Sequence, residues 1–267
     1  MKLTQFGISL TAVMAIVVSM PALLSTPRAF ADSTVQEAVD PSDYRIQVDL
    51  GHQLNKDRFK DVRVSVADGV ITLTGNVELF ADREAAEKKA IHAKKDVAVR
   101  NQIRIRGARI PDEDLQSTLV KKLQHDRVGY GSTAFNAISV SVSDGVVTLG
   151  GHAYGPMDKS SALSVASYTP GVQDVIDAID VDPVSPMDDM IRLRVARLVY
   201  GSSSLSKYAI DPGKPIRISV RNGNATLYGS VDSQADRDMA GILANSAAGV
   251  FKVTNELHIE NASSEPN

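Results

Sequence analysis

The chain has 267 residues, of which 43% are hydrophobic and 23% are charged, and its formal net charge is -3 at pH 7. This length predicts two or three domains, and the hydrophobic content is sufficient for packed cores. The chain contains no cysteine, which excludes disulfide bonds, thiol catalysis, cysteine-ligated metals and an acylated cysteine anchor.

The first 31 residues have the features of a secretory signal peptide. Lys2 precedes an uncharged, mostly apolar run at residues 7–24, and Ala29-Phe30-Ala31 places small residues where signal peptidase cleaves. We expect cleavage after Ala31 and localisation in the periplasm. The alternative is an uncleaved transmembrane anchor, because a run of 18 uncharged residues is just long enough to span a bilayer.

Removal of residues 1–31 leaves 236 residues with a formal net charge of -5. An acidic chain lacks the basic excess that neutralises phosphate groups, so we expect no nucleic acid among its partners. Residues 32–42 and 261–267 are expected to be tails on either side of the folded part.

One hairpin pattern occurs three times between these tails. Each copy has an Asx-Gly pair, which favours a two-residue turn, and a preceding strand in which apolar and polar residues alternate. A Thr-Leu pair and a second glycine follow each turn at constant spacing. The structural glycines are Gly69 and Gly75, Gly145 and Gly151, and Gly223 and Gly229. The repetition predicts three copies of one folded unit.

A helix and a further strand follow each hairpin. Two alanines four residues apart recur at a fixed distance from the second glycine, and this spacing places both on one face of a helix. We expect that face to lie close to the sheet. The alanine pairs are Ala86 and Ala90, Ala162 and Ala166, and Ala240 and Ala244.

A helix also precedes each hairpin, because apolar residues recur there at intervals of four, as at Leu115, Leu119 and Leu123. The sequence therefore predicts an α+β fold of three tandem αββαβ repeats. Each repeat is expected to be a small three-stranded mixed sheet with two helices packed on one face. The expected bounds are 43–106, 112–182 and 187–260.

This pattern resembles the BON domain family, named for osmotic-shock and nodulation proteins of bacteria. The resemblance rests on the hairpin segments 62–75, 138–151 and 216–229 and on the alanine pairs, and it covers essentially the whole chain after residue 31. Two departures are Lys95-Asp96, where the other repeats have Gly-Val, and Asn222-Gly223-Asn224 in place of Asp-Gly-Val. The resemblance implies a location in the cell envelope and association with phospholipid membranes, usually without catalysis.

The sequence contains none of the common motifs of catalytic or cofactor-binding sites. Nucleotide-binding glycine loops, the serine hydrolase elbow, the zinc protease motif and the EF-hand loop are all absent. The five histidines have no ligand spacing, and Ser202-Ser203-Ser204 falls in an expected long loop with no base nearby. We therefore expect no catalytic residue, no cofactor and no metal site.

Charge is distributed unevenly over the three expected repeats, with net values of +3, -6 and +1 in chain order. In the first repeat, strand alternation places a set of arginines on the sheet face opposite the helices. That set is Arg63, Arg100, Arg104 and Arg106, and the same face of the second repeat carries Asp174, Ile176 and Asp180. These residues are candidates for a contact between repeats or with lipid, and we favour docking of Arg104 and Arg106 onto Asp174 and Asp180.

A second basic cluster lies near the end of the alanine-bearing helix of the first repeat. It consists of Lys88, Lys89, Lys94 and Lys95, which are candidate lipid-contact residues. The alternative explanation for these lysines is structural, because the helix dipole favours cations at a helix C-terminus.

Together these features predict a non-enzymatic periplasmic envelope protein that associates with anionic phospholipid and contributes to envelope or osmotic stress tolerance. One alternative is a scaffold or chaperone-like module that binds envelope proteins without contacting lipid. Another is a module that senses a small solute or an ion.

Overall fold

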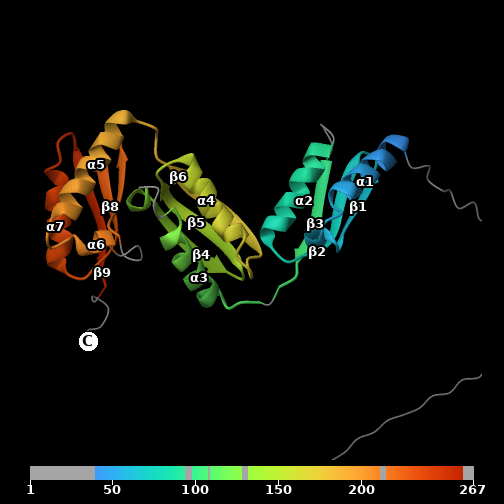
Figure 1. Ribbon diagram of the computed structural model, residues 1–267, viewed down its shortest axis with the longest axis horizontal. Coiled ribbons are helices and arrows are strands. Elements are labelled where there is room, and N and C mark those ends of the chain that lie inside the picture. Colours follow the sequence, from blue (N-terminus) through green and yellow to red (C-terminus); the bar gives the residue numbers. More distant parts are fainter. Residues whose placement is uncertain (1–39, 94–97, 108, 128–131, 211–214, 261–267) are drawn as a thin grey trace, which may run out of the picture. The chain divides into compact units, whose positions relative to one another are not determined.

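The computed structural model describes residues 40–93, 98–107, 109–127, 132–210 and 215–260. The expected signal peptide, most of the expected N-terminal tail and the C-terminal tail lie outside the described residues. The described elements form three αββαβ repeats, each with one three-stranded sheet (Figure 1). The predicted α+β fold class and the three repeats are confirmed.

The three repeats contain the same strands and long helices in the same order, and the third has the short helix α6 where the first two have a 3-10 helix. The first consists of α1 (Pro41–Gln53), η1 (Asp57–Phe59), β1 (Val62–Ala67), β2 (Val70–Val77), α2 (Phe80–Ala93) and β3 (Ala98–Ile105). The second consists of α3 (Asp112–His125), η2 (Thr133–Phe135), β4 (Ala137–Ser143), β5 (Val146–Ala153), α4 (Pro156–Ser167) and β6 (Asp174–Val181). The third consists of α5 (Pro186–Gly201), α6 (Lys207–Ile210), β7 (Arg217–Arg221), β8 (Asn224–Val231), α7 (Gln234–Asn245) and β9 (Lys252–Ile259).

The first helix begins slightly earlier than expected. The side chain of Asp40 caps α1 by accepting a hydrogen bond of 2.7 Å from the backbone N–H of Ser42, with Pro41 as the first helical residue. The helix thus includes two residues that the sequence pattern had assigned to the N-terminal tail. At α5, Ser185 caps the helix in the same way, and the helix begins at Pro186.

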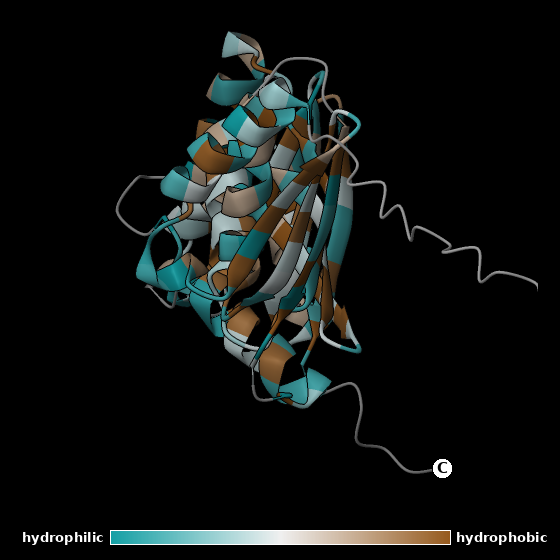
Figure 2. Cartoon of the chain, turned by 90° about the vertical axis from the view of Figure 1, so that its right-hand side faces the viewer, coloured by the Kyte–Doolittle hydropathy of each residue, from teal (hydrophilic) through white to brown (hydrophobic). Residues whose placement is uncertain are grey.

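Each sheet is mixed, as predicted. In the first repeat, β1 pairs antiparallel with β2 and β2 pairs parallel with β3, and the other two sheets repeat this order. Alternate residues face the helices, so Val62 and Val64 belong to the apolar core while Arg63 between them is exposed. Figure 2 shows the alternation as brown and teal segments along the strands.

The alanine pairs lie against the sheets, as their spacing predicts. All six alanines have a relative exposure of 0% and belong to the apolar clusters of their repeats. A methyl group allows close approach of the helix backbone to the sheet, so the space for a larger side chain is absent at these positions.

A carboxylate from the first helix of each repeat closes the hairpin turn. In the second repeat, the backbone N–H groups of Asp144 and Gly145 donate to the Asp112 carboxylate, at 2.7 and 2.9 Å. Both turn residues have positive φ, 52° and 77°, the geometry that Asx-Gly pairs favour. The equivalent bonds join Gly69 to Asp43, and Asn222 and Gly223 to Asp188.

The second glycine of each hairpin is required for a steric reason. Gly75 has φ +113°, and a Cβ atom there would lie 1.9 Å from the carbonyl oxygen of Asp61. The corresponding distances are 2.1 Å at Gly151 and 2.7 Å at Gly229. No side chain fits at these positions without displacing backbone, so the glycines fix how the chain enters each hairpin.

Residues 202–210, which follow α5 in the expected long loop, include the short helix α6. The Tyr208 hydroxyl of this segment donates to the Asp236 carboxylate at 2.8 Å. The same hydroxyl accepts a hydrogen bond from the backbone N–H of Asp232, at 2.7 Å. Tyr208 therefore links residues 202–210 to α7.

Candidate functional site

The arginines predicted for the face of the first sheet opposite the helices are exposed. Arg63, Arg100 and Arg104 alternate with core residues along β1 and β3, and Arg106 follows the last residue of β3. Arg106 pairs with Asp61 of its own repeat, at 3.6 Å. The face assigned from strand alternation therefore agrees with the structure.

The contact predicted between the first two repeats is corrected by the structure. Asp174 pairs with Arg83 of α2, whose Nη2 atom lies 3.2 Å from Oδ1, and not with Arg104 or Arg106. Asp180 is exposed, and so is Ile176. Alternation along a strand fixes the face on which a side chain lies, but it does not determine which element of a neighbouring repeat comes close to it.

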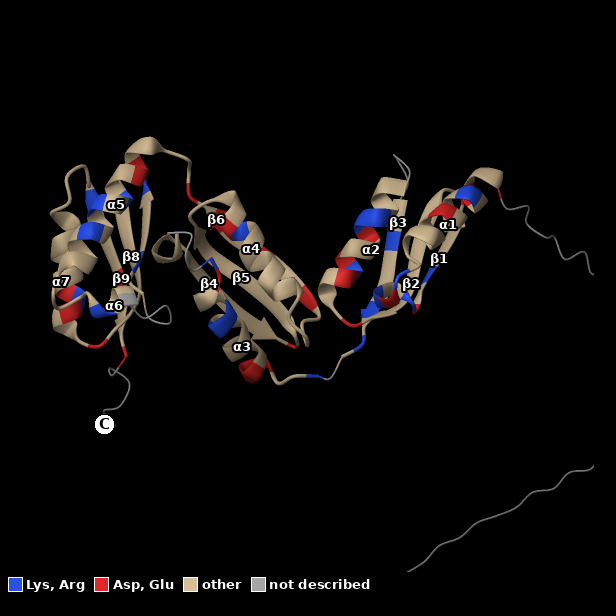
Figure 3. Cartoon of the chain, in the orientation of Figure 1, with Lys and Arg blue, Asp and Glu red and all other residues tan. Residues whose placement is uncertain are grey.

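The predicted lysine cluster is only partly covered by the structure. Lys88 is exposed on α2 and Lys89 is half-buried, while Lys94 and Lys95 lie outside the described residues. Lys and Arg residues on α2 and α5 appear in blue in Figure 3. Glu84 and Glu87 lie on the same helix as Lys88, so α2 presents both signs of charge.

A buried ionic cluster joins the second and third repeats. The carboxylate of Asp182, which follows β6, accepts hydrogen bonds from Arg192 of α5 at 3.2 Å and from Arg221 of β7 at 2.9 Å. Ser219 donates to both oxygens of the same carboxylate. Nδ1 of His152 lies 3.8 Å from Oδ1 of Asp182. Sequence reasoning missed this cluster, because arginine in a helix is normally a surface residue.

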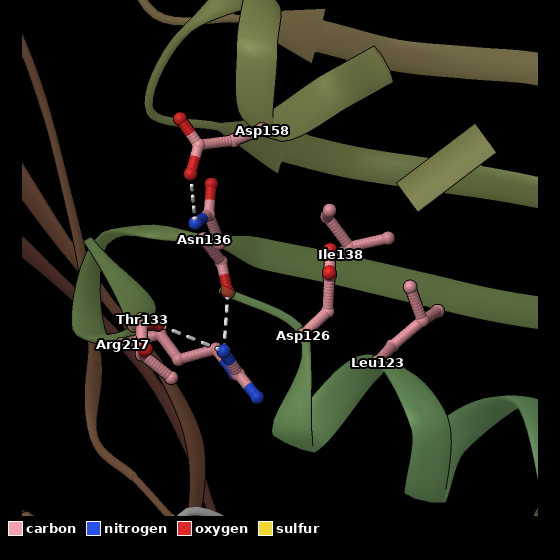
Figure 4. A pocket seen from close by; sticks show the side chains of 7 residues that line it. All are labelled: Leu123, Asp126, Thr133, Asn136, Ile138, Asp158 and Arg217. Atoms are coloured by element: carbon pink, nitrogen blue, oxygen red, sulfur yellow. Dashed lines mark hydrogen bonds between the residues drawn. The ribbon is translucent and has the colours of Figure 1, made fainter. Parts of the chain in front are cut away.

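A small polar cavity lies beside a second contact between these repeats (Figure 4). Arg217 of β7 donates to the carbonyl oxygens of Thr133 and Asn136, at 3.0 and 2.6 Å. Asn136 in turn donates to Asp158 at 2.9 Å. Burial lowers the pKa of Arg217, and the nearby Tyr200 opposes the shift. The cavity has a volume of about 20 Å³, which is room for one water molecule, so it is a structural site.

The outer surface of α5 has an unusual composition. Its exposed residues include four apolar side chains and two arginines, at the spacing of one helix face: Met187, Met190, Leu193, Arg194, Arg197 and Leu198. The two acidic residues of α5 lie elsewhere, since Asp188 is buried against the hairpin turn and Asp189 pairs with Arg192. Exposed Met239 and Ile242 lie on α7, which packs beside α5. We call these eight residues the α5–α7 face.

The other repeats provide an internal comparison for this face. The positions of α3 that correspond to Met190, Leu193 and Arg197 hold Asp114, Ser117 and Lys121, all exposed. In α1 the same positions hold Arg45, Val48 and His52. The same three positions are therefore polar and charged in the second repeat, mixed in the first, and apolar with arginine in the third. The common fold does not require the apolar side chains, which points to a binding surface.

Three αββαβ units in tandem define a modular repeat protein. The model of the BON domain family matches residues 42–107, 111–183 and 202–261, and the chain belongs to this family. The third match begins after α5, although α5 contributes Ile191, Val195 and Val199 to the core of the third repeat.

Two further comparisons place individual proteins beside this chain. Osmotically-inducible protein Y of Escherichia coli (strain K12) is 27% identical over 144 residues, which cover 53% of this chain and 71% of that protein. Two solved structures of CdsD, a structural protein of the type III secretion system of Chlamydia trachomatis, align with a TM-score of 0.23 each. They are 16% and 17% identical to this chain and cover 81% and 83% of it, and the aligned parts are 91% and 99% of those chains.

Proposed function

We propose that this protein is a non-enzymatic envelope protein of the periplasm that contacts anionic phospholipid through the α5–α7 face. The periplasmic location is supported by the signal-peptide features of residues 1–31 and by membership of the BON domain family. A role in osmotic stress is supported by the similarity to Osmotically-inducible protein Y. Intact-mass analysis of the exported protein should show Asp32 as its first residue.

The observation that carries the proposal is the combination of apolar and arginine side chains on α5. Apolar side chains enter the boundary between headgroups and acyl chains, while arginines remain at the level of the phosphates. Each basic residue near an anionic surface contributes about 1 kcal/mol to binding, and salt weakens this contribution. Among the described residues, no helix is long and apolar enough to cross a membrane.

The proposal is tested by co-sedimentation with vesicles of anionic or zwitterionic phospholipid. Leu193→Asp with Arg197→Glu should lower the affinity for anionic vesicles at least about tenfold, because one apolar contact is lost and one charge is reversed. The matched control is Ser117→Asp with Lys121→Glu, at the corresponding positions of α3, and it should bind like the wild type.

The test also separates the alternative sites and functions. If Lys88→Glu with Lys89→Glu abolishes binding while the α5 variant binds normally, the membrane contact lies on the first repeat, as the sequence pattern had suggested. If the wild type binds neither kind of vesicle, the lipid proposal is wrong and the protein-binding scaffold is favoured.

A further inference from the structure

The methionines of the described residues are all exposed. Their relative exposures are 67% for Met157, 61% for Met187, 43% for Met190 and 41% for Met239. Methionine is usually a core residue, so exposure at all four positions is unexpected. The chain contains no cysteine, which leaves the thioether as its most readily oxidised type of side chain.

Three of these four methionines belong to the α5–α7 face. Met187 and Met190 lie on α5, and Met239 lies on α7. We propose that these three residues are sites of reversible oxidation to methionine sulfoxide, and that their oxidation releases the face from the membrane. The regulatory part of this inference rests on the proposed function.

The chemistry requires a peroxide as oxidant. The thioether sulfur attacks one oxygen of hydrogen peroxide, the O–O bond breaks, and the sulfur gains that oxygen while the other oxygen leaves as water. The sulfur is oxidised by two electrons and the peroxide is reduced by two. The product is a polar, chiral side chain in place of a flexible apolar one, and methionine sulfoxide reductases reverse the change.

The position of the sulfur atoms explains why oxidation would act on binding. Met190 lies one helical turn from Leu193 and Arg194, so a sulfoxide there places a strong hydrogen-bond acceptor among the side chains that enter the lipid. Peroxide does not oxidise the aliphatic side chains of Leu193, Leu198 and Ile242. Membrane binding by the face would therefore be weakened and not abolished, which is consistent with reversible regulation.

Met157 supplies an internal control. It is the most exposed of the four and lies in the first turn of α4, in the second repeat and outside the α5–α7 face. Its oxidation by peroxide should proceed at least as readily, because access is greater. A sulfoxide at this position should have no effect on vesicle binding.

The experiment treats the purified protein with hydrogen peroxide and measures two quantities. Peptide mapping by mass spectrometry gives the sulfoxide at each methionine, and co-sedimentation gives the affinity for anionic vesicles. We expect sulfoxide at all four positions and a loss of affinity of at least about tenfold, because a polar group replaces an apolar contact at each of the three methionines of the face. Reductases for both sulfoxide epimers should restore binding.

Leucine substitutions identify the responsible residues. The variant Met187→Leu, Met190→Leu, Met239→Leu should bind vesicles normally and keep its affinity after peroxide treatment. Met157→Leu should lose affinity like the wild type. Equal urea midpoints of all proteins before treatment would establish that folding is unaffected.

Three results would overturn the inference. If the three methionines remain unmodified while Met157 is oxidised, they are not oxidation sites. Sulfoxide at all three with unchanged affinity would disprove the regulatory role while leaving the lipid proposal intact. If the untreated protein does not bind vesicles, the proposed function and the regulation fail together, and peptide mapping alone decides whether the sites exist.

Discussion

The guanidinium of Arg192 and the carboxylate of Asp182 form an ion pair of 3.2 Å in which the side chains are only 1% and 0% exposed. Arg192 also donates to the carbonyl oxygen of Val220, at 2.7 Å, and lies over the ring of Tyr154. Because Asp182 belongs to the second repeat and Arg192 to the third, the pair makes the folding of the two repeats interdependent.

Removal of this arginine should be strongly destabilising. Arg192→Leu leaves the buried Asp182 with fewer compensating groups, and breaking a buried pair on one side typically costs about 3–5 kcal/mol. Urea denaturation measures the change, with Arg194→Leu on the exposed side of the same helix as control. Similar free energies of unfolding for the two variants would show that the cluster is not a stabilising contact.

Substitution of the second hairpin glycine should be far more harmful than substitution of a helical one. Gly75→Ala places a methyl group against the Asp61 carbonyl at an unfavourable φ and should cost on the order of 3 kcal/mol. Gly51→Ala, in α1 and with no atom within 4 Å of the new methyl group, should stabilise the protein by about 0.5–1 kcal/mol. Thermal unfolding of both variants tests the pair, and a stable Gly75→Ala protein would contradict the steric argument.

The alanine faces leave no space for a larger side chain. Ala166→Leu forces three additional carbon atoms into a fully buried contact and should cost about 1–3 kcal/mol through overpacking. Ser160→Leu, exposed on the same helix, is the control and should change the free energy of unfolding by less than about 0.5 kcal/mol. Equal denaturation midpoints for the two variants would refute the assigned helix face.

The third repeat should lose stability in acid through Asp236. Burial acts to raise the pKa of this carboxyl, but hydrogen bonds from Lys207 and Tyr208 outweigh it and hold the pKa below its usual value. The ionised form therefore stabilises the fold above about pH 4, and this contribution is lost as the pH falls through the lowered pKa.

Asp236→Asn isolates this contribution. At neutral pH it should cost about 1–3 kcal/mol, and the difference from the wild type should shrink as the pH falls through the lowered pKa of Asp236. Asp238→Asn, exposed on the same helix, should show little difference at either pH. A difference for Asp236→Asn that stays constant with pH would rule out ionisation as the cause.

The sequence predicts the backbone of each repeat well because its signals are local. Asx-Gly pairs determine the turns, strand alternation determines the sheet faces, and the alanine pairs determine the helix faces. Contacts between distant segments have no comparable periodicity. Arg83 meeting Asp174 and Arg192 meeting Asp182 both depend on how elements far apart in sequence come together.

The apolar residues of the α5–α7 face are visible in the sequence, but periodicity alone does not distinguish them from the core residues of the same helix. Ile191, Val195 and Val199 form the expected core stripe of α5, yet Met190 and Leu193 add apolar residues on the opposite side. A helix that is apolar on two sides needs two apolar environments, and comparison with the corresponding helices of the other repeats identifies the second side.

The absence of tryptophan allows a direct test of the membrane contact, because a single introduced indole is the only one in the chain. Three variants would be compared on anionic vesicles: Leu193→Trp on α5, Ser117→Trp at the corresponding position of α3, and Ile91→Trp near the lysines of α2. We predict a blue shift of the emission, with quenching by lipid-embedded quenchers, for Leu193→Trp alone. A shift at Ile91→Trp or Ser117→Trp with none at Leu193→Trp would contradict the assignment of the membrane contact to the α5–α7 face.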